Sequence, residues 1–161
     1  MSKKANTEAY LILHNIRSTH NVGSIFRTAD AVGVTKIFLT GFTPAPIDRF
    51  GRARSDIAKT ALGAEKTISW ERHSSATALL IALKKKGVYI IAVERVKGAR
   101  NYKKLEVHFP VVFVFGNEVR GLSKNICARA DAVAEIPMRG KKESLNVSVA
   151  VGVVLYNALL V

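Results

Sequence analysis

The stretch IPMRGKKESLNVSVAVGVVLY, residues Ile136–Tyr156, decides how the rest of the chain is interpreted. An apolar segment ends at Pro137, and a basic loop that contains glycine leads to Ser144. Ser144 is a favoured N-cap residue, so we expect a helix to open there. Valine nevertheless favours strands, and periodicity alone cannot assign an apolar run of this kind. Its conformation therefore has to be inferred from what precedes it.

Upstream, apolar segments alternate with segments of helical periodicity. The expected strands are Ala9–His14, Lys36–Thr40, Lys66–Trp70, Val88–Val93, Val111–Phe115 and Val133–Pro137. The expected helices are Val22–Val32 (capped by Asn21 and ended by Gly33), Asp56–Leu62, Ser74–Lys86, Lys124–Ala130 and a last one after Ser144. The link Arg95–Lys104 shows no convincing element. Continuous apolar strands that alternate with helices predict an α/β fold, with a mostly parallel six-stranded sheet and helices on both faces.

Length and composition indicate a single domain over residues 1–161. Hydrophobic residues make up 48% of the 161 residues, which is enough for one core. No segment reaches the roughly 18 apolar residues of a membrane span. The N-terminal MSKKANTEAY lacks the apolar core of a signal peptide, and the single cysteine, Cys127, fits a reducing compartment. We therefore expect a cytoplasmic protein without membrane contacts.

The charge balance indicates a polyanionic partner. The chain has 25 Lys and Arg against 12 Asp and Glu, a net charge of +13. In a compact domain this excess favours nucleic acid, and we expect RNA, with a generally basic solvated surface as the alternative. The residues expected to bind RNA are Arg49, Arg52, Arg54, Arg139, Lys141 and Lys142.

Three polar loops follow expected strands. They are HNVGSIFRTADAVG with Asn21 and Arg27, FGNEVRGLS with Glu118, and the loop before the last helix with Ser144 and Asn146. In open parallel sheets, ligands bind beyond the carboxyl ends of the strands, so these side chains are candidates for one site. Taken singly, each has a structural alternative. Asn21, Glu118 or Ser144 could cap a helix, and the arginine could be a solvated helix residue.

Together the three loops resemble the three motifs of the SpoU (TrmH-like) RNA ribose 2′-O-methyltransferases of the SPOUT superfamily. NVGSIFRTADAVG is similar to the first motif, FGNEVRGLS to the second, and IPMRGKKESLNVSVAVGVVLY to the third. KTALGAEK, Lys59–Lys66, is also typical of the family. The resemblance covers residues 10–157 and implies transfer of a methyl group from S-adenosylmethionine to a ribose 2′-OH of tRNA or rRNA.

The resemblance further implies a deep C-terminal trefoil knot and a homodimer formed through the knot region. General topology rules argue against a knot, so this expectation rests on the resemblance alone. The apolar character of the C-terminal segment then fits a helix buried by the knot on one side and by a partner subunit on another. Gly152 would allow another backbone to approach this helix closely.

Roles for individual residues follow from the same resemblance. The catalytic residues would be Arg27, Asn21, Glu118, Ser144 and Asn146. The residues that bind S-adenosylmethionine would be Val93, Glu94, Gly116, Asn117, Ile136, Met138, Ser144 and Leu145, mostly through backbone contacts. A guanidinium group stays protonated near neutral pH and is therefore an awkward base. We expect Arg27 instead to bind a phosphate and to stabilise the developing alkoxide.

Two other functions stay open. One is a non-catalytic RNA-binding protein on the same knotted fold, although the intact set of site residues argues against it. The other is an ordinary doubly wound nucleotide-binding protein, which is disfavoured because no G-x-G-x-x-G follows the first strand. The four histidines show no metal-ligand spacing, so we expect no metal site.

Overall fold

Seven parallel strands form one sheet in the computed structural model, which describes residues 7–160. The strands are β1 (Ala9–His14), β2 (Lys36–Thr40), β3 (Ser69–His73), β4 (Tyr89–Val93), β5 (Arg100–Asn101), β6 (Val111–Phe115) and β7 (Ala132–Glu135). Their order across the sheet is β3-β2-β1-β6-β4-β7-β5. The central strands β1, β4 and β6 are almost wholly apolar, because a parallel sheet buries both of its faces. The N-terminal segment that we expect not to be a signal peptide consists largely of residues 1–6, and these lie outside the described residues.

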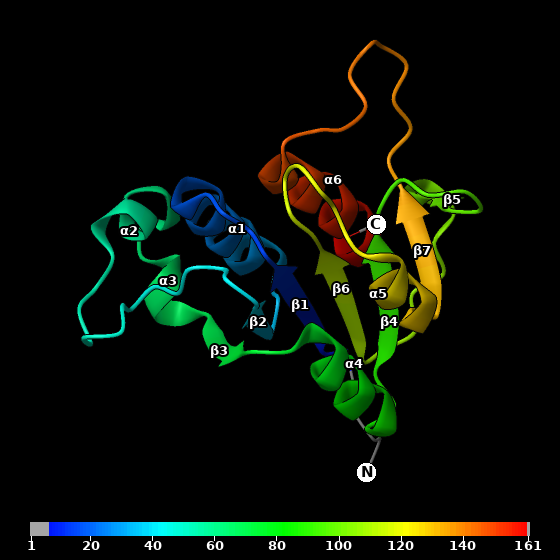
Figure 1. Cartoon of the computed structure of the whole chain (residues 1–161). Helices are drawn as coiled ribbons and strands as arrows, with labels where there is room; N and C mark the ends of the chain where they lie inside the picture. The colour runs from blue at the N-terminus through cyan, green and yellow to red at the C-terminus, as the bar shows by residue number, and fades with distance from the viewer. Residues whose placement is uncertain (1–6, 161) are drawn as a thin grey trace.

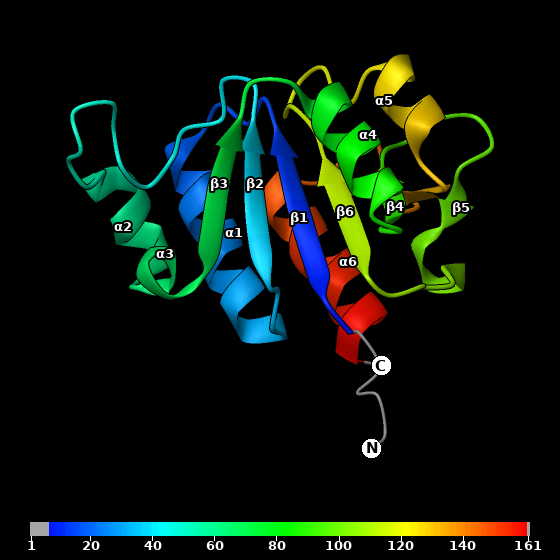
Figure 2. The same cartoon turned by 90° about the horizontal axis from the view of Figure 1, so that it is seen from below.

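Helices cover both faces of the sheet (Figure 1). They are α1 (Thr19–Val32), α2 (Ser55–Ala61), α3 (Ala64–Thr67), α4 (Ala76–Lys85), α5 (Lys124–Arg129) and α6 (Val147–Leu160), with a 3₁₀ helix, η1, at Tyr102–Lys104. Figure 2 shows α4 and α5 on one face and α1 and α6 on the other. Each face has its own hydrophobic core, around Phe26 and Phe113 on the α1 side and around Leu80 and Ile90 on the α4 side. The predicted parallel α/β architecture is confirmed.

Two predictions about the strands are wrong. The third strand is Ser69–His73 and not Lys66–Trp70, because residues 64–67 form α3. This strand lies at the edge of the sheet and exposes much of its polar sequence SWERH, so it has no apolar pattern to detect. The sheet also has seven strands and not six, because the link predicted to lack any element contains β5 and η1. None of the helices within residues 7–160 is long and apolar enough to cross a membrane.

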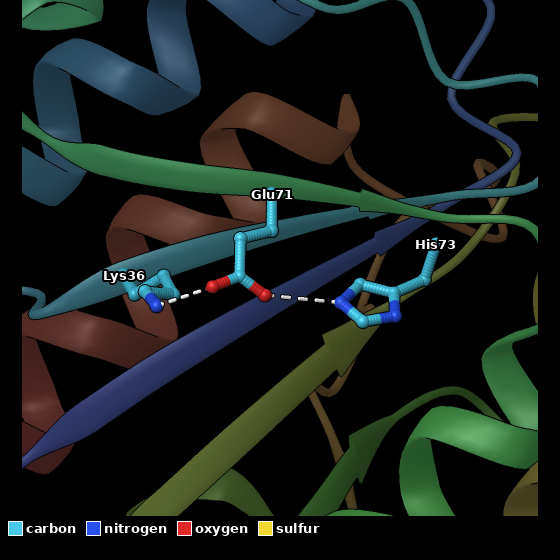
Figure 3. Close-up of polar contacts among 3 residues, drawn as sticks. All are labelled: Lys36, Glu71 and His73. Carbon is cyan, nitrogen blue, oxygen red and sulfur yellow. Dashed lines mark hydrogen bonds and ion pairs between the residues drawn. The ribbon is translucent and has the colours of Figure 1, made fainter.

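Three charged or polar side chains connect β2 to its neighbour β3, which is an edge strand of the sheet (Figure 3). Lys36 Nζ lies 2.6 Å from Glu71 Oε1, and His73 Nε2 lies 3.1 Å from Glu71 Oε2. The hydrogen bond from Lys36, reinforced by the one with His73, holds the pKa of Glu71 below its usual range. Charged side chains on an edge strand discourage pairing with the sheet of another molecule. We interpret this cluster as protection of the edge.

Helices α1 and α6 begin at different cap residues from those predicted. Ser18, not Asn21, caps α1, and its hydroxyl oxygen accepts a hydrogen bond from the Asn21 N–H at 3.1 Å. Asn146, not Ser144, caps α6, with Oδ1 accepting from the Ser148 N–H at 2.9 Å. Gly33 ends α1 in the left-handed conformation, as predicted. The side chains of Asn21 and Ser144 are therefore not used as caps.

The valine-rich segment is helical because one of its sides is buried. The buried residues of α6 are Val147, Val151, Val154 and Leu155, which recur at helical spacing. This side packs beside α1, where the nearest atom to a Cβ built on Gly152 is the Thr28 methyl carbon at 3.9 Å. Within the described residues, no backbone atom outside α6 lies within 4 Å of that Cβ position. Val149 and Tyr156 are 50% and 48% exposed, so much of the opposite side is apolar and accessible.

Candidate active site

The segments that follow β4, β6 and β7 enclose a cavity of about 430 Å³ at the carboxyl edge of the sheet. In Figure 1 the loops after β6 and β7 both extend from this edge, and the second returns to α6. All eight residues predicted to bind the cofactor line the cavity: Val93, Glu94, Gly116, Asn117, Ile136, Met138, Ser144 and Leu145. Wall residues to which the sequence assigned no such role include Arg95, Glu135, Glu143, Val147 and Ala150. Each of them lies within a few positions of a residue that was predicted. Their nearness to the motifs in the sequence is therefore the signal that could have identified them.

Glycines and one carboxylate hold the loop after β6 in place. A Cβ on Gly116 would lie 2.6 Å from the carbonyl carbon of Gly121, which itself has a φ of 64°. The Glu94 carboxylate occupies the space where a Gly121 side chain would lie. It accepts hydrogen bonds from the N–H groups of Leu122 at 2.7 Å and Arg95 at 2.9 Å. Glu94 therefore ties the end of β4 to this loop, in addition to lining the cavity.

Hydrogen bonds connect the three polar loops in one chain. Asn21 Nδ2 donates to Glu118 Oε1 at 3.3 Å. Asn146 Nδ2 donates to Asn21 Oδ1 at 3.2 Å, and the Ser148 hydroxyl donates to Asn146 Oδ1 at 2.6 Å. Asn21 is only 7% exposed, so at its own amide group solvent competes little for the two bonds that it makes. The structure thus brings together Asn21, Glu118 and Asn146, and it adds Ser148, which the sequence did not single out.

Glu118 is anchored to the backbone at the start of α1. Its carboxylate accepts hydrogen bonds from the N–H groups of Arg17 at 3.1 Å and Ser18 at 3.2 Å. Burial alone would raise the pKa of Glu118, but these backbone bonds and the one from Asn21 outweigh it and hold that pKa below its usual range. A carboxylate stabilised in this way is a poor proton acceptor. Its geometry suits the positioning of Asn21.

Two predicted catalytic residues lie outside the hydrogen-bonded chain. Ser144 is exposed and lies on the cavity wall. Arg27 is exposed on α1, six residues after Asn21, which places it about 9 Å further along the helix axis. Arg27 does not line the cavity. Within residues 7–160, the Arg27 side chain forms no hydrogen bond or ion pair with the other predicted catalytic residues.

The arginine-rich loop between β2 and α2 is an ordered structure. Asp48 Oδ1 accepts hydrogen bonds from the N–H groups of Phe50 at 2.8 Å and Arg52 at 3.0 Å. The guanidinium carbons of Arg49 and Arg52 lie 4.8 Å and 4.9 Å from the centre of the exposed Phe50 ring. Of the other predicted RNA-binding residues, Arg139, Lys141 and Lys142 are exposed between β7 and α6, whereas Arg54 is half-buried. The loop presents two cations and an aromatic ring to solvent.

Fold and site together define a class of protein: an open parallel α/β sheet with a cofactor-sized cavity at its carboxyl edge. The comparison with known sequences identifies the family. The sequence model of the SpoU rRNA Methylase family matches residues 8–156, so the chain belongs to this family.

Relatives and solved structures agree with this assignment. The tRNA (guanosine(18)-2′-O)-methyltransferase of Aquifex aeolicus (strain VF5) is 32% identical over 160 residues, covering 97% of this chain and 71% of the relative. The 23S rRNA (guanosine-2′-O-)-methyltransferase RlmB of Coxiella burnetii is 34% identical over 155 residues, covering 96% and 59%. The AdoMet-bound rRNA methyltransferase from Sinorhizobium meliloti has a TM-score of 0.83 at 30% identity, covering 93% and 55%. The chain thus spans little more than half the length of several relatives that it matches.

Proposed function

We propose that this protein is an RNA 2′-O-methyltransferase, which transfers a methyl group from S-adenosylmethionine to a ribose hydroxyl of tRNA or rRNA. The observation that carries the proposal is the set of side-chain hydrogen bonds that connects Glu118, Asn21 and Asn146 next to a cavity of cofactor size. The activities named for the Aquifex and Coxiella relatives support it.

The cavity suits S-adenosylmethionine in size and chemistry. Its volume lies in the range of roughly 300–1,000 Å³ that is usual for small-molecule sites. Val93, Ile136 and Leu145 offer an apolar wall for an adenine ring, and Glu135 and Glu143 offer carboxylates for a cationic ligand. When bound, S-adenosylmethionine supplies a methyl group activated by its bond to a positively charged sulfur. The AdoMet-bound structure of the Sinorhizobium relative supports this choice of cofactor.

The polar chain beside the cavity would orient the ribose. Asn21 and Asn146 each donate one side-chain N–H to another site residue. The second N–H of each amide is left for a substrate oxygen. Glu118 fixes Asn21, and Ser144 on the cavity wall would make a further contact with the ribose. Holding a hydroxyl in line with a reactive methyl group would supply much of the rate.

We also propose a homodimer that forms through α6 and the neighbouring α1. Val149, Tyr156 and Leu160 are 50%, 48% and 56% exposed on α6, and an apolar helix surface of this kind favours a protein partner. Arg27 would then complete the partner's site, because it is exposed beside this surface and lies outside its own cavity. There its guanidinium would bind a phosphate and stabilise the alkoxide that develops as the ribose hydroxyl passes its proton to water.

Mixing two impaired variants tests this arrangement. Arg27→Ala and Asn146→Ala should each lower the rate about 10²-fold or more when tested alone, whereas their mixed dimers should regain one intact site. Random exchange of subunits should restore about a quarter of the wild-type methyl transfer. A mixture that stays as impaired as each variant alone, with subunit exchange verified by sedimentation of differently tagged chains, would place Arg27 at its own subunit's site.

The trefoil knot is a further part of the proposal. It is supported by the family match, and by the position of β6 between β1 and β4, with α6 returning to the face of α1 (Figure 2). A crystal structure with continuous density through residues 111–160 tests it. A chain trace that straightens without a knot when its two ends are pulled would contradict it.

Methyl transfer to RNA tests the function itself. Tritiated S-adenosylmethionine, incubated with the protein and bulk tRNA or rRNA, should yield label that nuclease digestion locates on a ribose 2′-oxygen. Asn146→Ala should lower the rate about 10²-fold, because misplacing the ribose forfeits its alignment. Lys85→Ala, an exposed change on α4, serves as the control. Binding of both S-adenosylmethionine and RNA without transfer would instead indicate the non-catalytic alternative.

A further inference from the structure

A second pocket, of about 630 Å³, lies at the carboxyl ends of β1 and β2. Its walls include His14, Asn15, Arg17, Phe42 and Ser123. It shares Asn117, Val119, Arg120 and Gly121 with the cofactor cavity. Because β6 lies between β1 and β4 in the sheet, the loop after β6 separates the two hollows. Molecules bound in the two hollows would therefore lie on opposite sides of the same loop.

The mouth of this second pocket combines an aromatic ring with cations. Phe42 is 56% exposed and Val119 is 84% exposed, so the surface is apolar where solvent reaches it. Arg17 and Arg120 are exposed, and neither forms an ion pair with any residue in the range 7–160. Exposed aromatic rings stack on unpaired bases, and free guanidinium groups bind phosphates.

Hydrogen bonds fix the backbone that presents Phe42. Asn15 Oδ1 accepts from the Phe42 N–H at 3.1 Å, and Asn15 Nδ2 donates to His14 Nε2 at 3.2 Å. His14 Nδ1 therefore carries the ring proton and donates to Thr40 Oγ1 at 2.9 Å. Burial lowers the pKa of His14, in keeping with a neutral ring. The floor of the pocket is thus organised before any ligand arrives.

Asn15 is held in an unusual conformation. Its φ is 56°, and its carbonyl oxygen accepts a hydrogen bond from Asn117 Nδ2 at 2.8 Å. Gly41 has a φ of 62°, and a Cβ there would collide with the Asn15 side chain. A non-glycine residue in the left-handed region persists only where its surroundings impose it, often at functional sites. Asn117 connects the hollows, because it lines both and also clamps Asn15.

We infer that this pocket binds an unpaired base of the substrate RNA, next to the nucleotide that is methylated. Phe42 stacks on the base, and Arg17 and Arg120 hold the adjoining phosphates. The inference rests on the proposed function, because it assigns a second part of the same RNA. A nucleotide fits better than a peptide, because two unpaired arginines flank the ring on a chain of net charge +13.

Binding of a short fluorescein-labelled single-stranded RNA of mixed sequence, followed by anisotropy, tests the role of Phe42. Phe42→Ala should weaken binding about tenfold, the usual effect of one lost base stack. Phe42→Trp, which keeps an aromatic face, should bind like the wild type. Leu62→Ala removes a side chain that is similarly exposed, at 66%, outside the pocket and should change nothing. Calorimetric binding of S-adenosylmethionine should be equal in all four proteins.

Abasic substitution identifies the base directly. An RNA substrate found by methyl transfer is made with one abasic nucleotide at each position in turn. At the position that the pocket holds, the wild type should lose about tenfold in affinity, and Phe42→Ala should lose nothing more. Equal losses in both proteins would overturn the inference, as would a Phe42→Ala variant that binds RNA normally or that alters only the oligomeric state. If the wild type neither binds nor methylates RNA, the proposed function fails as well.

Discussion

Asn21 joins the polar loops because it is buried and bonded on both sides. It donates to Glu118 and accepts from Asn146, residues that are 97 and 125 positions away in the sequence. An amide suits this position because it offers both a donor and an acceptor. A carboxylate at residue 21 would face the Glu118 carboxylate without a proton between them. The role of a cap residue, expected from the sequence, belongs instead to Ser18.

Glu118 should make the stability of the protein depend on pH. Its folded pKa is lowered, so its ionised form contributes stability above the unfolded pKa of about 4.3, and this is lost as the pH falls through the folded pKa. Glu118→Gln should lower the free energy of unfolding by about 1 kcal/mol at neutral pH, since solvent screens a partly exposed group. Urea denaturation from neutral pH down to about pH 3 should show this difference vanishing.

Glu106→Gln is the matched control, because Glu106 is exposed and forms no hydrogen bond or ion pair with residues 7–160. Its effect on stability should be close to zero at every pH. A difference between wild type and Glu118→Gln that stays constant with pH would show that the backbone bonds at Arg17 and Ser18 do not depend on the charge.

Among the helices, α1 is the one on which the candidate site depends. Its start supplies Asn21, one side packs beside α6, and its other helical neighbours are α2 and α3. The approach of α2 requires Gly23, because a Cβ there would collide with the Thr60 side chain and with the Ile57 carbonyl oxygen. The Ile57 carbonyl oxygen belongs to the backbone of α2, so a change in the Thr60 rotamer cannot relieve the collision with it.

Gly23→Ala should therefore destabilise the protein by about 1–3 kcal/mol, although alanine normally stabilises a helix relative to glycine. Gly152→Ala is the comparison within α6, since a Cβ there meets only the Thr28 methyl at 3.9 Å. Within one subunit it should be neutral or stabilise by up to about 1 kcal/mol. Chemical denaturation measures both. A loss of dimer in Gly152→Ala would show that the partner's backbone packs at Gly152.

For the molecule as a whole, the charge balance predicts how the proposed RNA substrate would bind. A net charge of +13 predicts RNA affinity that falls steeply with salt. Arg49→Gln should reduce the slope of log affinity against log salt by about one, because one phosphate contact is lost. Lys85→Gln, on α4, should leave the slope unchanged. Equal slopes in wild type and Arg49→Gln would remove the loop of Arg49 from the RNA footprint.

The sequence predicted those parts of the fold that have a strong local signal. The strands β1, β4 and β6 are apolar runs, and Gly33 marks the end of α1 by its left-handed conformation. The edge strand Ser69–His73 has no such signal, because it is exposed to solvent and its sequence is polar. The strand β5 has none because it is only two residues long. The cap of α6 was misplaced because Ser144 and Asn146 are both good N-cap residues.

The alternation of strands and helices, the basic charge and the three polar loops in their family order can all be read from the residues alone. These features depend on residue type and on near neighbours along the chain. Three features become visible only once the chain is folded. Glu118, Asn21 and Asn146 share hydrogen bonds, Arg27 does not line the cavity at the carboxyl edge, and a second pocket adjoins that cavity. The physical reason is that each depends on which strand ends are adjacent. In the folded sheet β6 lies between β1 and β4, and the residues of the loops do not indicate this strand order.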